Sequence, residues 1–451
     1  MKGGADMTIL IPDDVQSIIE KIEAHGHSAY IVGGCVRDAV MGRVPHDYDI
    51  CTSALPEEVL VIFKDRKVIE TGLQHGTVTV QGDTDYYEVT TYRIDGEYTD
   101  GRHPDSVKFV DDVVADLARR DFTINAMAYN AHTGLIDPFG GYEDIKKKLI
   151  RSVGCAEHRF QEDALRIMRA VRFAATCGFA IHDDTHNAML NLRHLLVNVS
   201  EERKTTEFLK MLVCADADLL IKYRDVFSTF IPELIPTFDF KQNNPHHIYD
   251  VYSHTVHAVA EAPQDAQIRL SLMFHDIAKP LVYSEDENGI GHFYGHADDG
   301  AVIAKNIMKR MRLDNDTIDI VSGLIAAHDI TLSTSPKFTR RMISKMGELQ
   351  FRRLIEVIRA DKMAQSKNTD TMTNLGMLIS IEYNIGEALS KNECLTLKDL
   401  AVNGHDLIAV GITDGKMIGA TLQYLLETVL SEPHKNVKET LISMALKLHG
   451  M

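Results

Sequence analysis

The sequence has no long hydrophobic run. No uninterrupted apolar stretch approaches the roughly 18 residues that a membrane-spanning helix needs. The first residues, Met1 to Asp14, hold only a short apolar patch before acidic residues follow, so we expect no secretory signal. The sequence therefore predicts a protein that is neither inserted in a membrane nor secreted.

Paired cysteine motifs are also absent. The six cysteines are scattered and form no C-x-x-C pair; they are residues 35, 51, 155, 177, 214 and 394. In a chain of this size such a distribution is typical of reduced, structural thiols. We therefore expect a cytoplasmic protein.

Basic residues are outnumbered by acidic ones: 48 Lys/Arg stand against 65 Asp/Glu, and the formal net charge is −17. Proteins that bind nucleic acids usually carry a basic balance, since phosphate contacts dominate their affinity. The charge is uneven, however: residues 143–172 contain eight Lys/Arg and five Asp/Glu. Such a local basic stripe can hold a polyanion, and it is equally compatible with a solvated helix face.

Length and periodicity indicate several domains of different composition. A chain of 451 residues is too long for one ordinary core. Strand and helix signals alternate up to about residue 140, and apolar residues at three- and four-residue spacing predominate afterwards. We predict a small mixed head over 1–145, helical segments over 146–240 and 241–368, and a helical tail over 369–451.

The head contains a predicted strand, a pair of glycines and the start of a helix. The strand covers residues 29–32, Gly33 and Gly34 follow, and the helix is predicted over 36–41. Adjacent glycines let a backbone approach a polyphosphate closely, and the amides of a following turn favour anions. Arg37 lies one turn into the helix, where its guanidinium could bind phosphate oxygens.

Two carboxylates follow in Asp47-Tyr48-Asp49-Ile50. On a strand, residues two apart point to the same face, so both side chains are expected to converge. Two converging acids repel each other unless a hard cation such as Mg²⁺ lies between them, and nucleotidyl transfer uses that arrangement. Glu88, on a strand predicted over 87–92, is a third candidate, although it could also be a surface residue.

These segments resemble the class II tRNA nucleotidyltransferases, or CCA-adding enzymes, and the related bacterial poly(A) polymerases. The resemblance covers residues 33–49, 116–127 and 161–173, and extends more loosely to the C-terminus. It implies an α+β fold, with a polymerase β-like nucleotidyltransferase head followed by a long all-helical neck, body and tail. It also implies base selection and RNA binding in the neck.

The resemblance assigns roles to single residues. Asp47 and Asp49 match the magnesium ligands. Several positions match contacts to the incoming nucleotide, and they are Gly34, Arg37, Arg120, Asp163, Arg166, Arg169 and Arg172. Asp163 and Arg166, three apart and therefore expected on one helix face, would accept C and A and leave G and U with unpaired polar groups.

The implied reaction is addition of CCA to the 3′ end of tRNA from CTP and ATP, with Mg²⁺ as cofactor and no protein partner. In this family a flexible loop supports the change from C to A addition, and the glycine-rich segment 94–104 is predicted to be that loop. Addition of A alone, or of poly(A), is the alternative.

A second pattern lies in the helical part, where eight of the 21 histidines fall between residues 246 and 328. Helical bundles build metal sites from ligands on different helices. The order of ligands resembles the HD superfamily of metal-dependent phosphohydrolases, and implies ligands at His254, His275, Asp276 and Asp361. His296 and His328 are candidates for a second metal.

This second resemblance implies hydrolysis of a phosphate ester at damaged RNA ends, such as a 2′,3′-cyclic phosphate or a phosphomonoester. The site could also be purely structural. Three hypotheses follow: a tRNA nucleotidyltransferase, a phosphohydrolase whose head holds RNA, and a non-catalytic RNA-binding protein.

Overall fold

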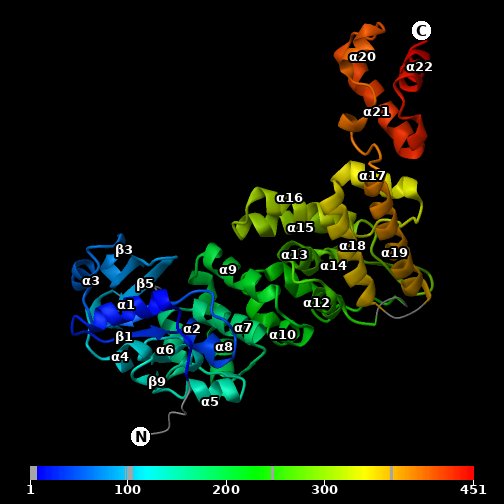
Figure 1. Ribbon diagram of the computed structural model, residues 1–451. Coiled ribbons are helices and arrows are strands. Elements are labelled where there is room, and N and C mark those ends of the chain that lie inside the picture. The colour runs from blue at the N-terminus through cyan, green and yellow to red at the C-terminus, as the bar shows by residue number, and fades with distance from the viewer. Residues whose placement is uncertain (1–7, 97, 99–104, 245–247, 366–368, 451) are drawn as a thin grey trace. The chain divides into compact units, whose positions relative to one another are not determined.

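The computed structural model describes residues 8–96, 98, 105–244, 248–365 and 369–450. It contains two compact units, of residues 1–215 with 222–232 and of residues 216–221 with 233–451. The longer strands occur in the first 140 residues, blue and cyan in Figure 1, and the chain that follows is almost entirely helical. The predicted α+β class, a mixed head followed by a helical remainder, is confirmed.

The head is built on a seven-stranded sheet with the order β3-β4-β5-β2-β1-β8-β9. These strands are β1 (Ala29–Val32), β2 (Asp49–Thr52), β3 (Val68–Gly72), β4 (Thr77–Gln81), β5 (Tyr86–Thr91), β8 (Ala128–Asn130) and β9 (Gly134–Ile136). Strand β2 pairs antiparallel with β1 and parallel with β5. Val32 is opposite Asp49, so the turn after β1 lies beside the first residue of β2.

The two faces of this sheet have different roles. Ile31, Ile50 and Val89 are paired across β1, β2 and β5 and are buried, and burial of each such side chain stabilises the fold by roughly 1.5–3 kcal/mol. On the other face Cys51 packs in a cluster with Leu117. Because alternate residues share a face, Asp49 projects from the same side as Cys51.

Helices and short elements complete the first unit. Those of the head are α1 (Asp13–Glu23), α2 (Gly34–Val40), α3 (Pro56–Ile62), η1 (Leu73–His75), β6 (Arg93–Asp95), β7 (Val107–Phe109), α4 (Val113–Ala118), η2 (Thr123–Asn125) and α5 (Gly141–Lys146). Those that follow are β10 (Leu149–Ile150), α6 (Ala156–Glu162), α7 (Leu165–Cys177), β11 (Ala180–Ile181), α8 (Asp183–Leu192), η3 (Arg193–Asn198), α9 (Glu201–Leu212) and α11 (Arg224–Phe227). Helix α10 (Ala217–Lys222), except its last residue, belongs to the second unit.

The second unit is helical apart from one two-residue ladder, within the part of the chain that the structure describes. Its elements are η4 (Pro232–Thr237), α12 (Val251–Glu261), α13 (Ala266–Phe274), α14 (Lys279–Val282), β12 (Ser284–Glu285), β13 (Gly291–His292), α15 (His296–Arg310), α16 (Asn315–Ala327), α17 (Pro336–Met346), α18 (Glu348–Met363), α19 (Thr369–Ser390), η5 (Leu397–Asp399), α20 (Gly404–Ala409), α21 (Gly415–Ser431), η6 (Pro433–Lys435) and α22 (Lys438–Leu448). None of the described helices is long and apolar enough to cross a membrane.

Several predicted elements differ in detail from the structure. Asp47 precedes β2 instead of lying within a strand, because β2 begins at Asp49. Strands β3, β8 and β9 were not predicted. The last two have three residues each, so their strand conformation depends on pairing with β1 and with each other.

Two sequence predictions fall partly outside the described residues. Of the predicted loop 94–104, residues 97 and 99–104 are not described, and the boundary at 368/369 adjoins the undescribed 366–368. The four-domain division stays a prediction.

Candidate active site and histidine–aspartate cluster

The turn between β1 and α2 places an arginine beside the strand end. Gly33 has φ +80°, a left-handed conformation that favours glycine. A Cβ at this position would also lie 2.8 Å from Arg120 Nη1. Gly33 therefore serves two purposes, since it turns the chain into α2 and leaves room for the Arg120 guanidinium.

Three carboxylates, Asp47, Asp49 and Glu88, gather next to this turn, and all three are exposed to solvent. Partial desolvation raises the pKa of Asp49; the charge of Asp47 adds to this and Arg120 opposes it. Desolvation and the charge of Asp49 likewise raise the pKa of Glu88. Asp49 therefore interacts with both of the other acids, and each of these two pairs is repulsive.

This arrangement suits a hard divalent cation, which prefers oxygen ligands and relieves the repulsion. The carboxylates are nevertheless more open than a compact metal site. Among the described residues, the groups of three whose ligand atoms all lie within 4.8 Å of one another are in the second unit, not here.

The predicted phosphate ligand Arg37 has protein partners in the structure. Its Nε donates to Asp38 Oδ1 at 2.9 Å, and its Nη1 donates to Asn125 Oδ1 at 2.8 Å. The guanidinium also lies 5.1 Å from the centroid of the Phe173 ring. Arg37 thus connects α2 to η2 and α7, at the edge of the site.

The paired arginines at 119 and 120 have different environments. Arg119 donates from Nε and Nη2 to Asp116 Oδ1 at 2.9 and 2.8 Å, and its Nη1 lies 3.7 Å from Asp95. Arg120 is 3.6 Å from the other oxygen of the fully buried Asp116. Asp116 therefore anchors both side chains, and Arg120 is the one that reaches the glycine turn.

Asp163 lies between two helices rather than within one, which corrects the predicted single helix. It ends α6, its Oδ1 accepts from the Leu165 amide at 3.0 Å, and its Oδ2 accepts from Arg203 Nη2 at 2.7 Å. Aspartate competes for free amides at helix starts, and this bond helps to interrupt the predicted helix. Asp163 and Arg166 consequently do not share a face of one regular helix.

The three arginines of α7 are each paired with an acid. Arg166 donates to Glu162 at 2.5 Å and to the carbonyls of Arg159 and Arg119 at 3.0 and 3.2 Å. The remaining two lie against Asp121 and Glu207: Arg169 donates to Asp121 at 2.8 and 2.6 Å, and Arg172 is 2.5 Å from Glu207. These contacts join α7 to the segment that carries Arg120.

In the second unit, six predicted metal ligands converge in one buried place. His254 comes from α12, Asp361 from α18, and His275 with Asp276 from the end of α13. The first residue of α15 and the residue after α16 provide His296 and His328. All six side chains belong to buried residues. This group is called the HD cluster below.

The candidate ligand atoms of the HD cluster lie close enough together to share a cation. His254 Nε2 lies 2.9 Å from Asp361 Oδ1 and 3.6 Å from Asp276 Oδ2. His296 Nε2 lies 3.5 Å from Asp276 Oδ1 and 3.2 Å from His328 Nε2. Asp276 therefore belongs to two groups of three, one with His254 and His275 and one with His296 and His328.

Backbone carbonyls hold these imidazoles in the orientation that ligands require. The Nδ1 atoms of His275, His296 and His328 lie 2.7–2.8 Å from the carbonyl oxygens of Leu272, Phe293 and Ile325. A neutral ring that donates from Nδ1 has a lone pair on Nε2. The lone pairs of His296 and His328 would therefore face each other, which is unfavourable without a cation between them.

Within the HD cluster, one buried ring nitrogen lacks a hydrogen bond to any described residue, namely His275 Nε2. Its ionic neighbours are Asp276 Oδ2 at 3.2 Å and Asp361 Oδ1 at 3.5 Å. Burial alone would lower the pKa of His275, but the two aspartates outweigh burial and raise it to about 10. Histidine nitrogens and carboxylate oxygens gathered in one buried place are a donor set that fits a divalent metal.

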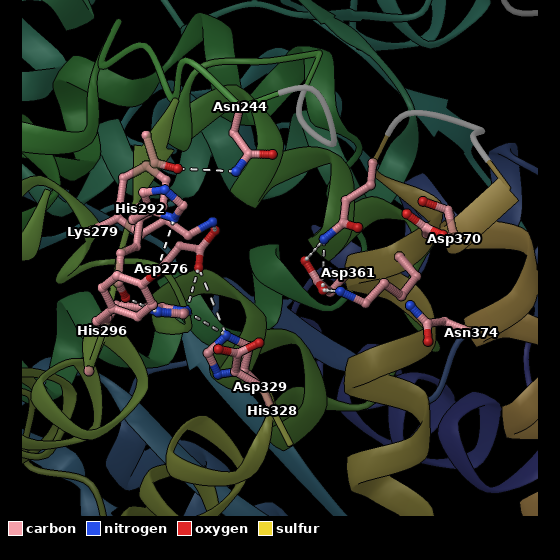
Figure 2. A pocket seen from close by; sticks show the side chains of 17 residues that line it. Asn244, Asp276, Lys279, His292, His296, His328, Asp329, Asp361, Asp370 and Asn374 are labelled. Carbon is pink, nitrogen blue, oxygen red and sulfur yellow. Dashed lines mark hydrogen bonds and ion pairs between the residues drawn. The ribbon is translucent and has the colours of Figure 1, made fainter. Parts of the chain in front are cut away.

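Four members of the HD cluster, Asp276, His296, His328 and Asp361, line a cavity of about 410 Å³ (Figure 2). Lys279 Nζ lies 2.7 Å from Asp276 Oδ2 and donates to Gln242 at 2.9 Å. Lys362 Nζ lies 3.2 Å from Asp361 Oδ2. Neither lysine was predicted from the sequence to belong to the site, although each is close in sequence to a predicted ligand.

Three family models match the chain, in consecutive order. They are a poly(A) polymerase head domain over residues 29–151, a probable RNA- and SrmB-binding site of polymerase A over 178–235, and a putative tRNA nucleotidyltransferase domain 2 over 296–445. The first match includes both the glycine turn and the three carboxylates.

Curated relatives are CCA-adding enzymes. The chain is 50% identical over 220 residues to that of Geobacillus thermodenitrificans, which is 48% of this chain and 54% of the relative. It is 47% identical over 221 residues to that of Oceanobacillus iheyensis, 49% of this chain and 54% of the relative. The chain thus spans about half the length of the curated relatives that it matches.

A solved structure extends the likeness over the whole chain. The Bacillus stearothermophilus CCA-adding enzyme, crystallised with CTP, matches 98% of both chains with a TM-score of 0.71 and 29% identity. The Thermotoga maritima CCA-adding enzyme, in a complex with tRNA, shares the fold at 20% identity and a TM-score of 0.56, over 98% of this chain and 97% of that one. Together with the three family models, these matches show that the chain is similar to CCA-adding enzymes in sequence over about half of its length and in fold over 98% of it.

Proposed function

We propose that this protein adds CCA to the 3′ end of tRNA, without a nucleic-acid template, from CTP and ATP. The observation that carries the proposal is the group of Asp47, Asp49 and Glu88 beside the glycine turn that Arg120 fills. The named relatives, about 50% identical over roughly half of the chain, support the same reaction.

In the proposed reaction the 3′ hydroxyl of the tRNA attacks the α-phosphorus of the nucleotide, and pyrophosphate leaves. Mg²⁺, held by Asp47 and Asp49, would supply charge stabilisation for the hydroxyl and for the leaving pyrophosphate. Glu88 would add a third negative charge beside the cation. Gly34 and Arg120 would bind the triphosphate, and Arg37 would orient the glycine turn through Asp38 and Asn125 or bind phosphate directly.

We assign base selection to Asp163 and Arg166, with Arg169 and Arg172 as supporting residues, because they match the family motif. Asp163 has a carboxylate at the start of α7 and could accept from the amino group that both C and A carry. Arg166 is 9% exposed, and its bonds to Glu162 and the Arg119 carbonyl would fix its direction. The specificity would then depend on a rigid junction of α6, α7 and the Arg119–Arg120 segment.

Incubation of tRNA lacking its 3′ CCA with labelled CTP and ATP tests this function. We expect Asp49→Asn to reduce incorporation by at least two orders of magnitude, because it removes a charge that Mg²⁺ requires, while circular dichroism stays unchanged. Asp83→Asn is the matched control, since the Asp83 side chain is exposed and outside the site. Undiminished incorporation by Asp49→Asn would exclude the head as the catalytic site.

The product of the same experiment separates the alternatives. Stepwise addition of C, C and A supports CCA addition, whereas A alone indicates an A-adding enzyme and a long ladder of A indicates a poly(A) polymerase. Absence of any incorporation would favour a non-catalytic RNA-binding protein.

We propose a second activity, hydrolysis of a phosphate ester at RNA 3′ ends, because the HD cluster has the convergent ligands and the buried, unbonded His275 Nε2 described above. The resident metal would be a second divalent cation held by His254, His275, Asp276 and Asp361, with His296 and His328 completing a second position. Lys279 and Lys362 would bind phosphate oxygens beside it.

His275→Ala should abolish two reactions at RNA 3′ ends, the opening of a 2′,3′-cyclic phosphate to a phosphomonoester and the release of phosphate from a phosphomonoester. Asp47→Ala should leave both unchanged. In the assay of CCA addition, Asp47→Ala should abolish incorporation and His275→Ala should leave it unchanged. If neither variant affects phosphate release, or if none is released by the wild type with any divalent metal, the HD cluster is structural.

We place the proposed reactions in the cytoplasm. The substrates inferred above, tRNA, CTP and ATP, are found there, and the six cysteines form no disulfide in the structure.

A further inference from the structure

An exposed aromatic side chain stands at the mouth of the HD cavity. Tyr294 lines this cavity, yet its residue is 76% exposed. Its ring is stacked on His292, with 5.3 Å between the centroids and 7° between the planes. One face of Tyr294 is therefore covered by an imidazole, and the high exposure leaves the other face open.

The position of this pair is fixed by its neighbours in sequence and space. Asp286 Oδ2 lies 3.2 Å from His292 Nε2, and the Tyr294 hydroxyl lies 3.3 Å from His292 Nδ1. Gly295, with φ +81°, then turns the chain into α15, whose first residue is the cluster member His296. Gly295 alone therefore separates Tyr294 from the proposed metal ligand along the chain.

Charges around the cavity restrict what can enter. Two lysines, Lys279 and Lys362, line it together with four aspartates, Asp276, Asp329, Asp361 and Asp370. Without divalent cations these acids would repel a phosphate; with cations on the HD cluster the balance becomes favourable. The volume of about 410 Å³ falls within the usual range for sites that hold a small organic ligand.

We propose that Tyr294, backed by His292, is a stacking platform for a nucleobase, and that the HD cavity selects a nucleoside with a phosphate on its ribose. This inference rests on the proposed phosphohydrolase function and specifies its substrate. The base lies on the open face of Tyr294, and the ribose phosphate points inward to the lysines and the HD cluster. Stacking accepts any base, since every base has a π face.

A fluorescence experiment tests the platform independently of catalysis. The chain contains no tryptophan, so Tyr294→Trp introduces a single indole at the platform. In the presence of Mn²⁺, we expect 2′-AMP to quench its emission and ribose 5-phosphate, which lacks a base, to leave it unchanged. EDTA should remove the quenching, because the phosphate then meets only the aspartates and lysines.

The matched control is Tyr383→Trp, which places an indole at another exposed tyrosine, 68% exposed and outside the residues that line the cavity. Its emission should not respond to either compound. Three outcomes would overturn the platform: equal quenching of both variants by 2′-AMP, equal quenching by ribose 5-phosphate, or no quenching of the Tyr294→Trp variant.

Kinetics give a second readout. Tyr294→Ala should raise KM for 2′-AMP about tenfold with little change in kcat, because base–aromatic stacking contributes on this order, and Tyr294→Phe should behave as the wild type. Hydrolysis of ribose 5-phosphate should be unaffected by either change. An identical loss with both substrates, or a loss in kcat alone, would contradict the proposal.

The fluorescence and kinetic experiments also distinguish failure of the stacking platform from failure of the proposed hydrolysis. Quenching by 2′-AMP with no phosphate release would support the platform and contradict hydrolysis. Phosphate release that Tyr294→Ala does not change, without quenching, would support hydrolysis and contradict the platform. Parallel KM measurements with tRNA that ends in a 2′-phosphate show whether the stacked nucleoside is the end of an RNA or a free nucleotide.

Discussion

At the scale of single residues, buried aspartates of the head are paired with arginines. Asp116 is fully buried between Arg119 and Arg120, and Asp121 is buried against Arg169. Buried charges are costly unless they are paired. The acids of this motif therefore set the positions of arginines that stand between the glycine turn and α7.

Asp121 provides a pH test of this arrangement. Burial would raise its pKa, but Arg169 and Asn125 outweigh burial and lower it to about 2 from an ordinary 3.8. A lowered pKa means that the contribution to stability is fully present above about pH 4 and is lost as the pH falls toward 2. Asp121→Asn should therefore reduce the free energy of unfolding by about 2 kcal/mol at pH 7.

The measurement is urea unfolding of both proteins between pH 2 and pH 7. The difference between wild type and Asp121→Asn should shrink below pH 4 and vanish near pH 2. A difference that does not vary with pH would mean that Asp121 acts through packing and not through its charge.

At the scale of elements, the proposed metal ligands come from the ends of helices as much as from their middles. His275 and Asp276 follow the last turn of α13, His296 begins α15 and His328 follows α16. Helix ends are where side chains replace missing backbone hydrogen bonds, so their geometry depends on caps. Asp265 caps α13 and accepts from the amides of Gln267 and Ile268 at 2.8 and 3.0 Å.

Asp265→Ala should destabilise the second unit by about 1 kcal/mol, the usual cost of losing such a cap. Calorimetry should show a lower transition temperature, and Asp265→Asn should recover most of the loss because asparagine caps equally well. Nucleotide incorporation at low temperature should be unchanged. An Asp265→Ala protein as stable as the wild type would show that packing alone positions α13.

Some elements could be predicted from the sequence and others could not. The strand before Gly33 and the helix α7 follow from local patterns of apolar residues. The short strands β8 and β9 have no such pattern, and they form because β8 pairs with β1 and β9 pairs with β8. The break at Asp163 was also missed, since its partner Arg203 is forty residues away.

At the scale of the whole molecule, the proposed metal of the HD cluster links binding to stability. Six buried residues that are proposed as ligands, from five helical segments, meet there. A ligand that binds only the folded state stabilises it, by about 2.7 kcal/mol at a hundredfold excess over its Kd. A cation on this cluster should therefore stabilise the second unit.

Removal of divalent metal with EDTA should lower the calorimetric transition temperature of the wild type and of Asp49→Asn by several degrees. His275→Ala should be less stable than the wild type and nearly insensitive to EDTA. Equal sensitivity of His275→Ala and wild type would place the stabilising cation elsewhere.

By itself, the sequence determined which ligands the protein is predicted to bind, namely phosphates and divalent cations. Adjacent glycines, carboxylates two residues apart and a His-Asp pair are local patterns that indicate such sites. It also determined the order of a mixed head and a helical remainder. Only the tertiary structure decided which groups meet. Arg37 bonds to Asn125, Arg120 fills the space beside Gly33, and Asp276 joins two groups of histidines, since these partners lie far apart along the chain and are brought together by packing.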